Sequence, residues 1–489
     1  MFQMRRWCTV ILMGCFLSAG CSLGTAVPED DSATGDKTGK PDIHIPTDIG
    51  DFEWRVADLS ADTAAGIELS DVLIVQNPSN AFAFFVEWET DLEAVCDLRI
   101  VCGEDIDTFL SGDTEATEHQ AYVMGLYAGA ECLLTFTAVA SGGETGSAVA
   151  SLSVGPVPDF LPQLTIDVLD YERIERGWTL FNLTNSFDKP PLIIAIVDEQ
   201  GRYRWYHQRA TNDPGSDTDT RTTKGGVLVG GSHGQVLPAM IDWEGNVVWE
   251  KKVNMHHDMR PYGDDGHLFY LIDSWSCGLD HSTGAVVEYD PETDQEIWQW
   301  NICEQYLPDN PKPDWSHLNA AAMPADQSYM IVSSRNQNAL FKVTLPAGNL
   351  VWKLAEDGDF AIDDSDVFYQ QHDPEVQPDG SILLFDNGQD GKRKYSRALQ
   401  LKVDETNLTA TRIWEYRLEP DVFAPIWGDA DRLPNGNTLI VFGQRNKSKE
   451  THIIEVTMEK EQVWHLVMPL KWGAYRAERI TEPVYGSIK

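Results

Sequence analysis

Short apolar strands alternate with polar turns along most of this chain, and from about residue 158 onward one pattern recurs six times. Each repeat has an aliphatic strand, an acidic turn and then a strand that carries a tryptophan, as in IIAIVDEQGRYRW and AVVEYDPETDQEIW. Successive tryptophans are 44 to 62 residues apart. Repeats of about 50 residues built from four short strands are typical of propeller blades. The pattern predicts a six-bladed β-propeller over residues 158–489, with repeat tryptophans at Trp205, Trp249, Trp298, Trp352, Trp414 and Trp464.

Five of the six repeats also show the strands that precede the tryptophan strand. In the third repeat the four strands read MHHDMRP, HLFYLIDS, GAVVEYD and QEIWQW. The first repeat is incomplete, because one of its strands is not visible in the pattern. The C-terminal segment AYRAERI is one source for that strand and would close the ring, but the sequence alone does not decide the point.

Residues 52–157 show a second pattern, a strict two-residue alternation in short runs such as AFAFFVEW, CDLRIVC and CLLTFTAVA. This period is that of half-buried strands separated by turns. With Trp88 in one strand and GLYAG at a corner, the region resembles a fibronectin type III β-sandwich, a module that usually binds or spaces. At 489 residues the chain exceeds one ordinary core. The expected fold class is therefore all-β: a six-bladed β-propeller preceded by a small sandwich.

The N-terminus has the features of an export signal. Arg5 and Arg6 precede an apolar stretch over residues 7–16, and the following LSAGC resembles a bacterial lipobox that ends at Cys21. On this interpretation residues 1–20 are a signal peptide, Cys21 is lipidated and residues 21–51 form an acidic flexible tether. Ser22 is what the resemblance associates with the outer membrane. The alternative is an ordinary secretory signal in which Cys21 is incidental. We expect a cell-envelope protein, and whether it faces the periplasm or the cell surface stays open.

The net charge limits the partners that this chain can bind, and the cysteine content limits the disulfides that it can form. The formal net charge of −40 repels phosphate backbones, so nucleic acid is excluded as a partner, and an anionic substrate needs a local cluster of positive groups. Five cysteines follow the tether, and in an oxidising compartment they are disulfide candidates. Cys277 and Cys303 form the natural pair in the propeller. The other three cysteines allow three pairings, of which Cys102 with Cys132 is favoured over those that use Cys96.

Three successive repeats place a histidine near the same point of their first strand: His257, His317 and His372. First strands line the central channel of a propeller, so these side chains should converge there. Three imidazoles suit zinc or copper, or they suit catalysis on an anion with one histidine as nucleophile. Arg335 favours the anion, because a guanidinium is repelled by a cation and binds sulfate or phosphate bidentately. Asn319 adds a further polar group to the set.

The segments DWSHLNAAAM, SSRNQNALFKV, QQHDPEVQPDGSILLFDNG, GDADRLPNGNTLIVFG and YRAERI resemble the bacterial arylsulfate sulfotransferases over roughly residues 192–480. The resemblance implies a periplasmic six-bladed propeller that moves a sulfuryl group from an aryl sulfate ester to a phenol without a nucleotide donor. It implies that His372 becomes transiently sulfated and that Arg335, His317 and Asn319 surround the sulfuryl oxygens. His257 is then the further histidine, although its neighbour His256 can take that role instead.

The role of Asp373, next to the expected nucleophile, has two interpretations: it fixes the tautomer of His372, or it merely faces a neighbouring strand. A covalent step at His372 predicts ping-pong kinetics, and no cofactor or metal is expected. The expected partners are a phenolic sulfate donor, a phenol acceptor and a membrane reached through the lipid anchor, and a homodimer stays open. Two other functions compete with this one. They are a non-catalytic envelope scaffold and a propeller oxidoreductase that binds a quinone or a metal.

Overall fold

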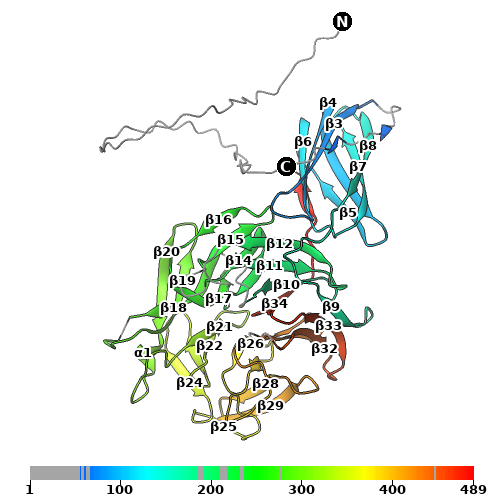
Figure 1. Ribbon diagram of the computed structural model, residues 1–489. Helices are drawn as coiled ribbons and strands as arrows, with labels where there is room; N and C mark the ends of the chain where they lie inside the picture. Colours follow the sequence, from blue (N-terminus) through cyan, green and yellow to red (C-terminus); the bar gives the residue numbers. More distant parts are fainter. Residues whose placement is uncertain are drawn as a thin grey trace, which may run out of the picture. The chain divides into compact units, whose positions relative to one another are not determined.

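Figure 1 shows the protein as a computed structural model. The structure describes residues 55–56, 60–61, 66–185, 191–209, 217–231, 236–263, 265–275, 277–444 and 448–488. The chain divides into two units, Met1–Asp51 and Phe52–Lys489, and the second carries all of the described residues. The expected signal peptide, the lipidated Cys21 and the tether therefore lie outside the described residues.

The first described strands form an antiparallel nine-stranded sheet with the order β1-β3-β4-β7-β8-β2, in which β5 and β6 pair with β4. Its longest strand, β4, pairs with β3 and β6 along its first half and with β5 and β7 along its second. Side chains along β4 alternate between buried and exposed, as the two-residue pattern predicts. The strands are β1 (Arg55–Val56), β2 (Ser60–Ala61), β3 (Leu69–Gln76), β4 (Phe84–Cys102), β5 (Ile106–Ser111), β6 (Ala116–Val123), β7 (Glu131–Val139) and β8 (Thr145–Ser153).

Six further sheets of four or five strands follow, which confirms the prediction of a six-bladed propeller (Figure 1). Blade 2 contains β13 (Thr220–Thr223), β14 (Gly226–Val229), β15 (Ala239–Asp242) and β16 (Val247–Glu250). Blade 3 contains β17 (Met255–Tyr262), β18 (His267–Ser274), β19 (Thr283–Asp290) and β20 (Gln295–Asn301). Blade 4 contains β21 (Leu318–Ala322), β22 (Tyr329–Ser334), β23 (Ala339–Thr344) and β24 (Leu350–Leu354). Blade 5 contains β25 (Ala361–Ile362), β26 (His372–Val376), β27 (Ile382–Asp386), β28 (Arg397–Asp404) and β29 (Thr409–Tyr416).

Blades 1 and 6 both use strands from distant parts of the chain, and this closes the ring. Blade 1 contains β10 (Trp178–Leu183), β11 (Leu192–Val197) and β12 (Tyr203–Arg209), and its innermost strand is the C-terminal β34 (Ala477–Ile480). Blade 6 contains β30 (Asp429–Arg432), β31 (Thr438–Phe442), β32 (Thr451–Val456) and β33 (Gln462–Met468), with β9 (Thr165–Leu169) along its outer edge. The C-terminal segment AYRAERI thus supplies the missing strand. The last strand, β35 (Gly486–Ile488), pairs with β6.

The repeated tryptophan is explained by contacts between neighbouring blades. Trp205, Trp352, Trp414 and Trp464 each donate their indole N–H to the turn before the fourth strand of the next blade; the acceptors are Trp243 O, Glu405 Oε1, Met458 O and Glu199 O. A buried indole normally finds such a partner. The tryptophan strand of one blade and the turn of the next are therefore in contact, and this contact explains why both features recur together in the sequence.

The remaining features of the fold are few. Among the described residues, the four-residue α1 (Ile302–Gln305) is the only helix, and no described helix is long and apolar enough to cross a membrane. Disulfides join Cys102 to Cys132, which are paired across β4 and β7, and Cys277 to Cys303. Cys96 is a buried thiol.

Candidate active site

The innermost strands of blades 3, 4 and 5 share one irregularity where the predicted histidines lie. The pairing register shifts between His256 and Met259, between Leu318 and Ala320, and between His372 and Glu375. His257, His317 and Asp373 have positive φ angles of 64°, 36° and 42°. Such bulges redirect side chains and are common beside active sites. The sequence register of the three histidines thus corresponds to a backbone feature that is repeated in three blades.

The structure brings the three histidines to one place. The ring centroids of His257 and His317 are 5.0 Å apart, and the ring of Tyr475 lies 6.0 Å from that of His257 and 6.0 Å from that of His372. The three histidines come from three different blades, and Tyr475 comes from the segment just before the closing strand β34. Residues far apart in the sequence therefore form one cluster around the channel.

His372 is held in one defined tautomer. Its Nδ1 lies 2.7 Å from Asn387 Oδ1 and 3.1 Å from the carbonyl oxygen of Gln370. The Asn387 amide cannot be turned around, because its nitrogen donates to the carbonyls of Ala424 and Trp427. Both partners of Nδ1 are acceptors, so Nδ1 carries the proton and Nε2 keeps its lone pair.

Electrostatics keep this imidazole neutral. Burial, and then the charge of Arg335, lower the pKa of His372 to about 3. Only 1% of the side chain is exposed. A neutral, buried imidazole beside a guanidinium is suited to attack an anionic electrophile that the guanidinium attracts.

The two rings of the doublet His256-His257 have different neighbours. His257 faces His317 and Tyr475, whereas His256 has its Nε2 3.5 Å from Asp273. The two Nδ1 atoms are 2.8 Å apart, so one ring must donate and the other accept. His257 is therefore the doublet member that belongs to the cluster.

His317 and Arg335 lie together on blade 4. Nδ1 of His317 is 2.9 Å from an oxygen of Asp314, and the backbone N–H of Arg335 donates to the carbonyl of His317 at 3.0 Å. The Nδ1–H group donates to the carboxylate, so Nε2 of His317 is the nitrogen left for other partners. The Arg335 guanidinium donates to Asn336 Oδ1 and to the carbonyl of Pro425.

Asn319 is on β21, two residues after His317. Its side chain is completely buried and its Nδ2 donates to the carbonyl of Gln371 at 2.7 Å. It therefore connects blade 4 to the backbone immediately before His372.

Asp373 does not set the tautomer of His372, because Asn387 and Gln370 fill that position. The Oδ1 atom of Asp373 instead contacts Arg260 of blade 3, Arg221 of blade 2 and Arg476 beside blade 1. Burial alone would raise the pKa of Asp373, but Arg476 and Arg260 outweigh it and hold the pKa well below its usual range. Of its two interpretations, the structure favours the one in which Asp373 faces neighbouring strands.

Two residues of this site were missed by sequence reasoning. Asn387 belongs to the FDNG segment at the end of β27, and Tyr475 precedes β34. The hydroxyl of Tyr475 is buried and has no hydrogen-bond partner among the described residues. Burial raises its pKa well above the ordinary value, so it stays a neutral donor. Both residues lie in segments that carry the family resemblance, QQHDPEVQPDGSILLFDNG and YRAERI. Sequence reasoning passed over them because asparagine and tyrosine are not residue types that a search for nucleophiles selects.

Comparison with known proteins identifies the family. The arylsulfotransferase (ASST) family model matches residues 170–476. The arylsulfate sulfotransferase AssT of Escherichia coli O6:H1 strain CFT073 is 28% identical over 171 residues, which are 27% of this chain and 28% of that protein. The arylsulfate sulfotransferase AssT of Lelliottia amnigena is 27% identical over 165 residues, 26% of this chain and 27% of that protein. The matches thus span only about a quarter of the length of these curated relatives.

Among solved structures, the periplasmic gluconolactonase PpgL of Pseudomonas aeruginosa aligns with 80% of this chain and 100% of its own, at 13% identity and a TM-score of 0.39. A likeness at that level says nothing about the chemistry of the channel. The family model covers more than half of the chain and includes every residue of the histidine cluster. The chain therefore belongs to the arylsulfotransferase family.

Proposed function

We propose that this protein transfers a sulfuryl group from an aryl sulfate ester to a phenolic acceptor through a sulfohistidine at His372. The observation that carries the proposal is the state of that ring, which is buried, neutral and protonated on Nδ1, with Nε2 unprotonated. Membership of the arylsulfotransferase family supports the reaction class. A scaffold has no use for such a nucleophile.

In the first step Nε2 of His372 attacks sulfur. The N–S bond forms as the S–O bond to the aryl group breaks, and the phenolate departs in line with the attack. Charge in such a loose transition state lies mainly on the peripheral and leaving oxygens. Arg335 is the group best placed to stabilise the sulfuryl oxygens, because a guanidinium binds planar anionic groups bidentately.

We assign the acid-base role to His317. Asp314 accepts a hydrogen bond from its Nδ1–H and so orients the ring, and the protonated Nε2 gives its proton to the leaving phenolate oxygen. In the second step the same nitrogen takes the proton of the acceptor phenol as its oxygen attacks sulfur and the N–S bond breaks. Neutral His372 is regenerated and the proton count balances. His257 and Tyr475 are left as donors beside the substrate.

The test is a two-substrate assay on the purified full chain with 4-nitrophenyl sulfate as donor and phenol as acceptor. We expect sustained nitrophenol release only with phenol, parallel double-reciprocal plots, and one sulfuryl group on the protein when phenol is omitted. Equal release with and without phenol would indicate a sulfatase. An inert protein across several aryl sulfates would reject the proposal.

The pH dependence of the first step provides an independent check. Because the pKa of His372 is lowered to about 3, its nucleophile is unprotonated from about pH 4 upward, whereas a free imidazole titrates near about 6.5. The single-turnover burst of nitrophenol should therefore have its acidic limb below about pH 4. A limb near pH 6.5 would show that a histidine of ordinary pKa is the nucleophile.

The same lowered pKa affects stability in a defined direction. Below about pH 6.5 the unfolded chain binds a proton at this position that the folded chain does not bind. The folded state therefore loses stability as the pH falls from that value toward 3. Circular dichroism at each pH must accompany the burst measurement, so that loss of fold is not taken for loss of the nucleophile.

The cellular setting is part of the proposal. We infer a signal peptide over residues 1–20, a lipid anchor at Cys21, a tether over residues 21–51 and an envelope location, on the basis of the N-terminal sequence pattern. We also infer that residues 52–157 are a fibronectin type III-like module that precedes the propeller. A homodimer is compatible with this arrangement.

A further inference from the structure

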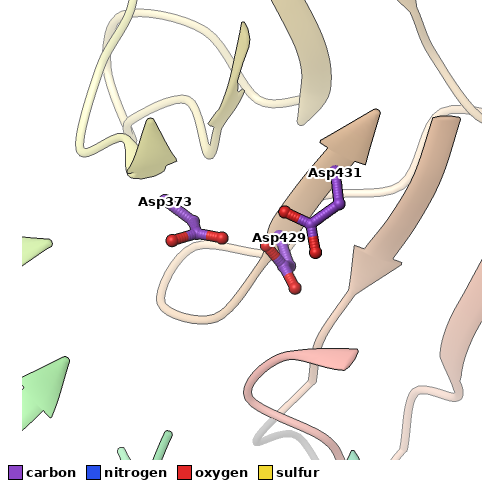
Figure 2. Close-up of side chains that lie close together, drawn as sticks. All are labelled: Asp373, Asp429 and Asp431. Carbon is purple, nitrogen blue, oxygen red and sulfur yellow. The ribbon is translucent and has the colours of Figure 1, made fainter. Parts of the chain in front are cut away.

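Three carboxylates lie together on the channel side of blades 5 and 6, and the proposed reaction does not use them. Asp373 is on β26, next to His372, and Asp429 and Asp431 are on β30. One oxygen from each lies within 4.8 Å of the others. Figure 2 shows the three carboxyl groups turned toward one another. We refer to these residues as the aspartate triad.

Ion pairs around the triad do not neutralise it. Three arginines from other blades, Arg221, Arg260 and Arg476, pair with three aspartates, Asp219, Asp258 and Asp373, within 4 Å. This set alone carries no net charge.

Asp429 and Asp431 add two carboxyl groups to that neutral set. Within the described residues, neither of them lies within ion-pair distance of a lysine or arginine side chain. When both are ionised, as metal binding requires, they place two unpaired negative charges at the triad.

One oxygen of the triad has no hydrogen-bond donor against it among the residues that the structure describes. Asp429 is 2% exposed, and its Oδ2 accepts the backbone N–H of Ala477 at 3.0 Å. Its Oδ1 is buried with no hydrogen-bond partner among the described residues. An unsatisfied buried carboxylate oxygen is costly unless a proton or a cation lies against it.

We propose that Asp373, Asp429 and Asp431 bind one hard divalent cation, of the class of Ca²⁺ or Mg²⁺. Carboxylate oxygens are the preferred ligands of these ions. The arginines contact Oδ1 of Asp373, which leaves Oδ2 for the ion. Asp431 is half-buried, so the triad is not sealed from solvent.

The position of the site suggests what the ion does. It would join β26 of blade 5 to β30 of blade 6 through the residue that follows His372. The ion is thus a structural element that holds the strand of the nucleophile and takes no part in the transfer itself. The inference does not depend on sulfuryl transfer, and its test measures binding and stability.

The test begins with the purified full chain, stripped with EDTA, dialysed against Ca²⁺ or Mg²⁺ and analysed for metal content. We expect one equivalent of tightly held ion and a melting temperature about 5 °C or more above that in EDTA. A chain without a bound equivalent, or with the same melting temperature in EDTA and in Ca²⁺, would overturn the proposal.

Variants separate the triad from other acidic positions and from a shared proton. Asp431→Asn and Asp429→Asn should lose the equivalent and the Ca²⁺-dependent rise, whereas Glu459→Gln, at an exposed turn between β32 and β33, should keep both. If a proton rather than a cation lies between the carboxylates, the asparagine variants mimic it and match or exceed the wild type in EDTA and in Ca²⁺ alike. An unchanged Ca²⁺ effect in Asp431→Asn would equally reject the site.

Discussion

Substituting asparagine for His372 is expected to reduce sulfuryl transfer by about 10⁴-fold or more, since removal of a covalent nucleophile leaves only binding and electrostatic stabilisation. Asparagine is close to histidine in length and polar at its end, so the buried position beside Asn387 stays filled. The measurement is nitrophenol release with phenol present, together with the mass of the peptide that contains residue 372. The variant should show no sulfated peptide.

A matched control is His267→Asn on β18, where the imidazole pairs with Glu288 outside the channel. It should transfer sulfuryl groups at the wild-type rate. His317→Asn should keep the sulfated peptide but lose about 10²-fold to 10⁴-fold in rate, because it removes an acid-base group and not the nucleophile. If His372→Asn still formed a sulfated peptide, the nucleophile would have to be another residue.

The propeller could be predicted from the sequence because its repeat is a physical contact repeated around a ring. In four of the six blades the repeat tryptophan meets the turn before the fourth strand of the next blade, as Trp352 meets Glu405. A contact that recurs in most blades leaves a periodic signal that one chain is enough to reveal. The same periodicity placed His257, His317 and His372 in register, since equivalent strands occupy equivalent places around the channel.

The rest of the site depends on contacts with no period. Asn387, just after β27, reaches His372 on the neighbouring strand β26, and Tyr475 belongs to the C-terminal segment that closes the ring. Asp429 and Asp431 become significant only because no described arginine forms an ion pair with them, and this can be known only from the ion pairs of Arg221, Arg260 and Arg476. In a bulged strand, the shifted pairing register decides which side of the sheet a residue faces. The two-residue alternation of buried and exposed side chains therefore does not predict it. Sequence reasoning therefore located the strands of the site but not the partners that tune it.

Alanine in place of Trp464 is expected to destabilise the propeller by about 3–5 kcal/mol, the range for a fully buried tryptophan in a core. Trp464 is on β33 with 0% exposure, and its Nε1 donates to Glu199 O in the turn between β11 and β12 at 2.7 Å. It therefore joins blade 6 to blade 1, where strands from the two ends of the propeller meet. The loss combines the cavity, the hydrogen bond and the contact of the ring with Arg479.

Two further variants show whether the loss of stability is specific to the junction between blade 6 and blade 1. Trp249→Ala removes a half-buried repeat tryptophan from blade 2 and should lower the urea midpoint by less. Trp464→Phe keeps most of the packing and should cost about 1 kcal/mol for the lost hydrogen bond. If Trp464→Ala and Trp249→Ala shifted the midpoint equally, blade 6 and blade 1 would be held together by the pairing of β9 and β34 with their blades. The indole would then be one packing contact among many, because closure would depend on strand exchange between the two ends of the chain.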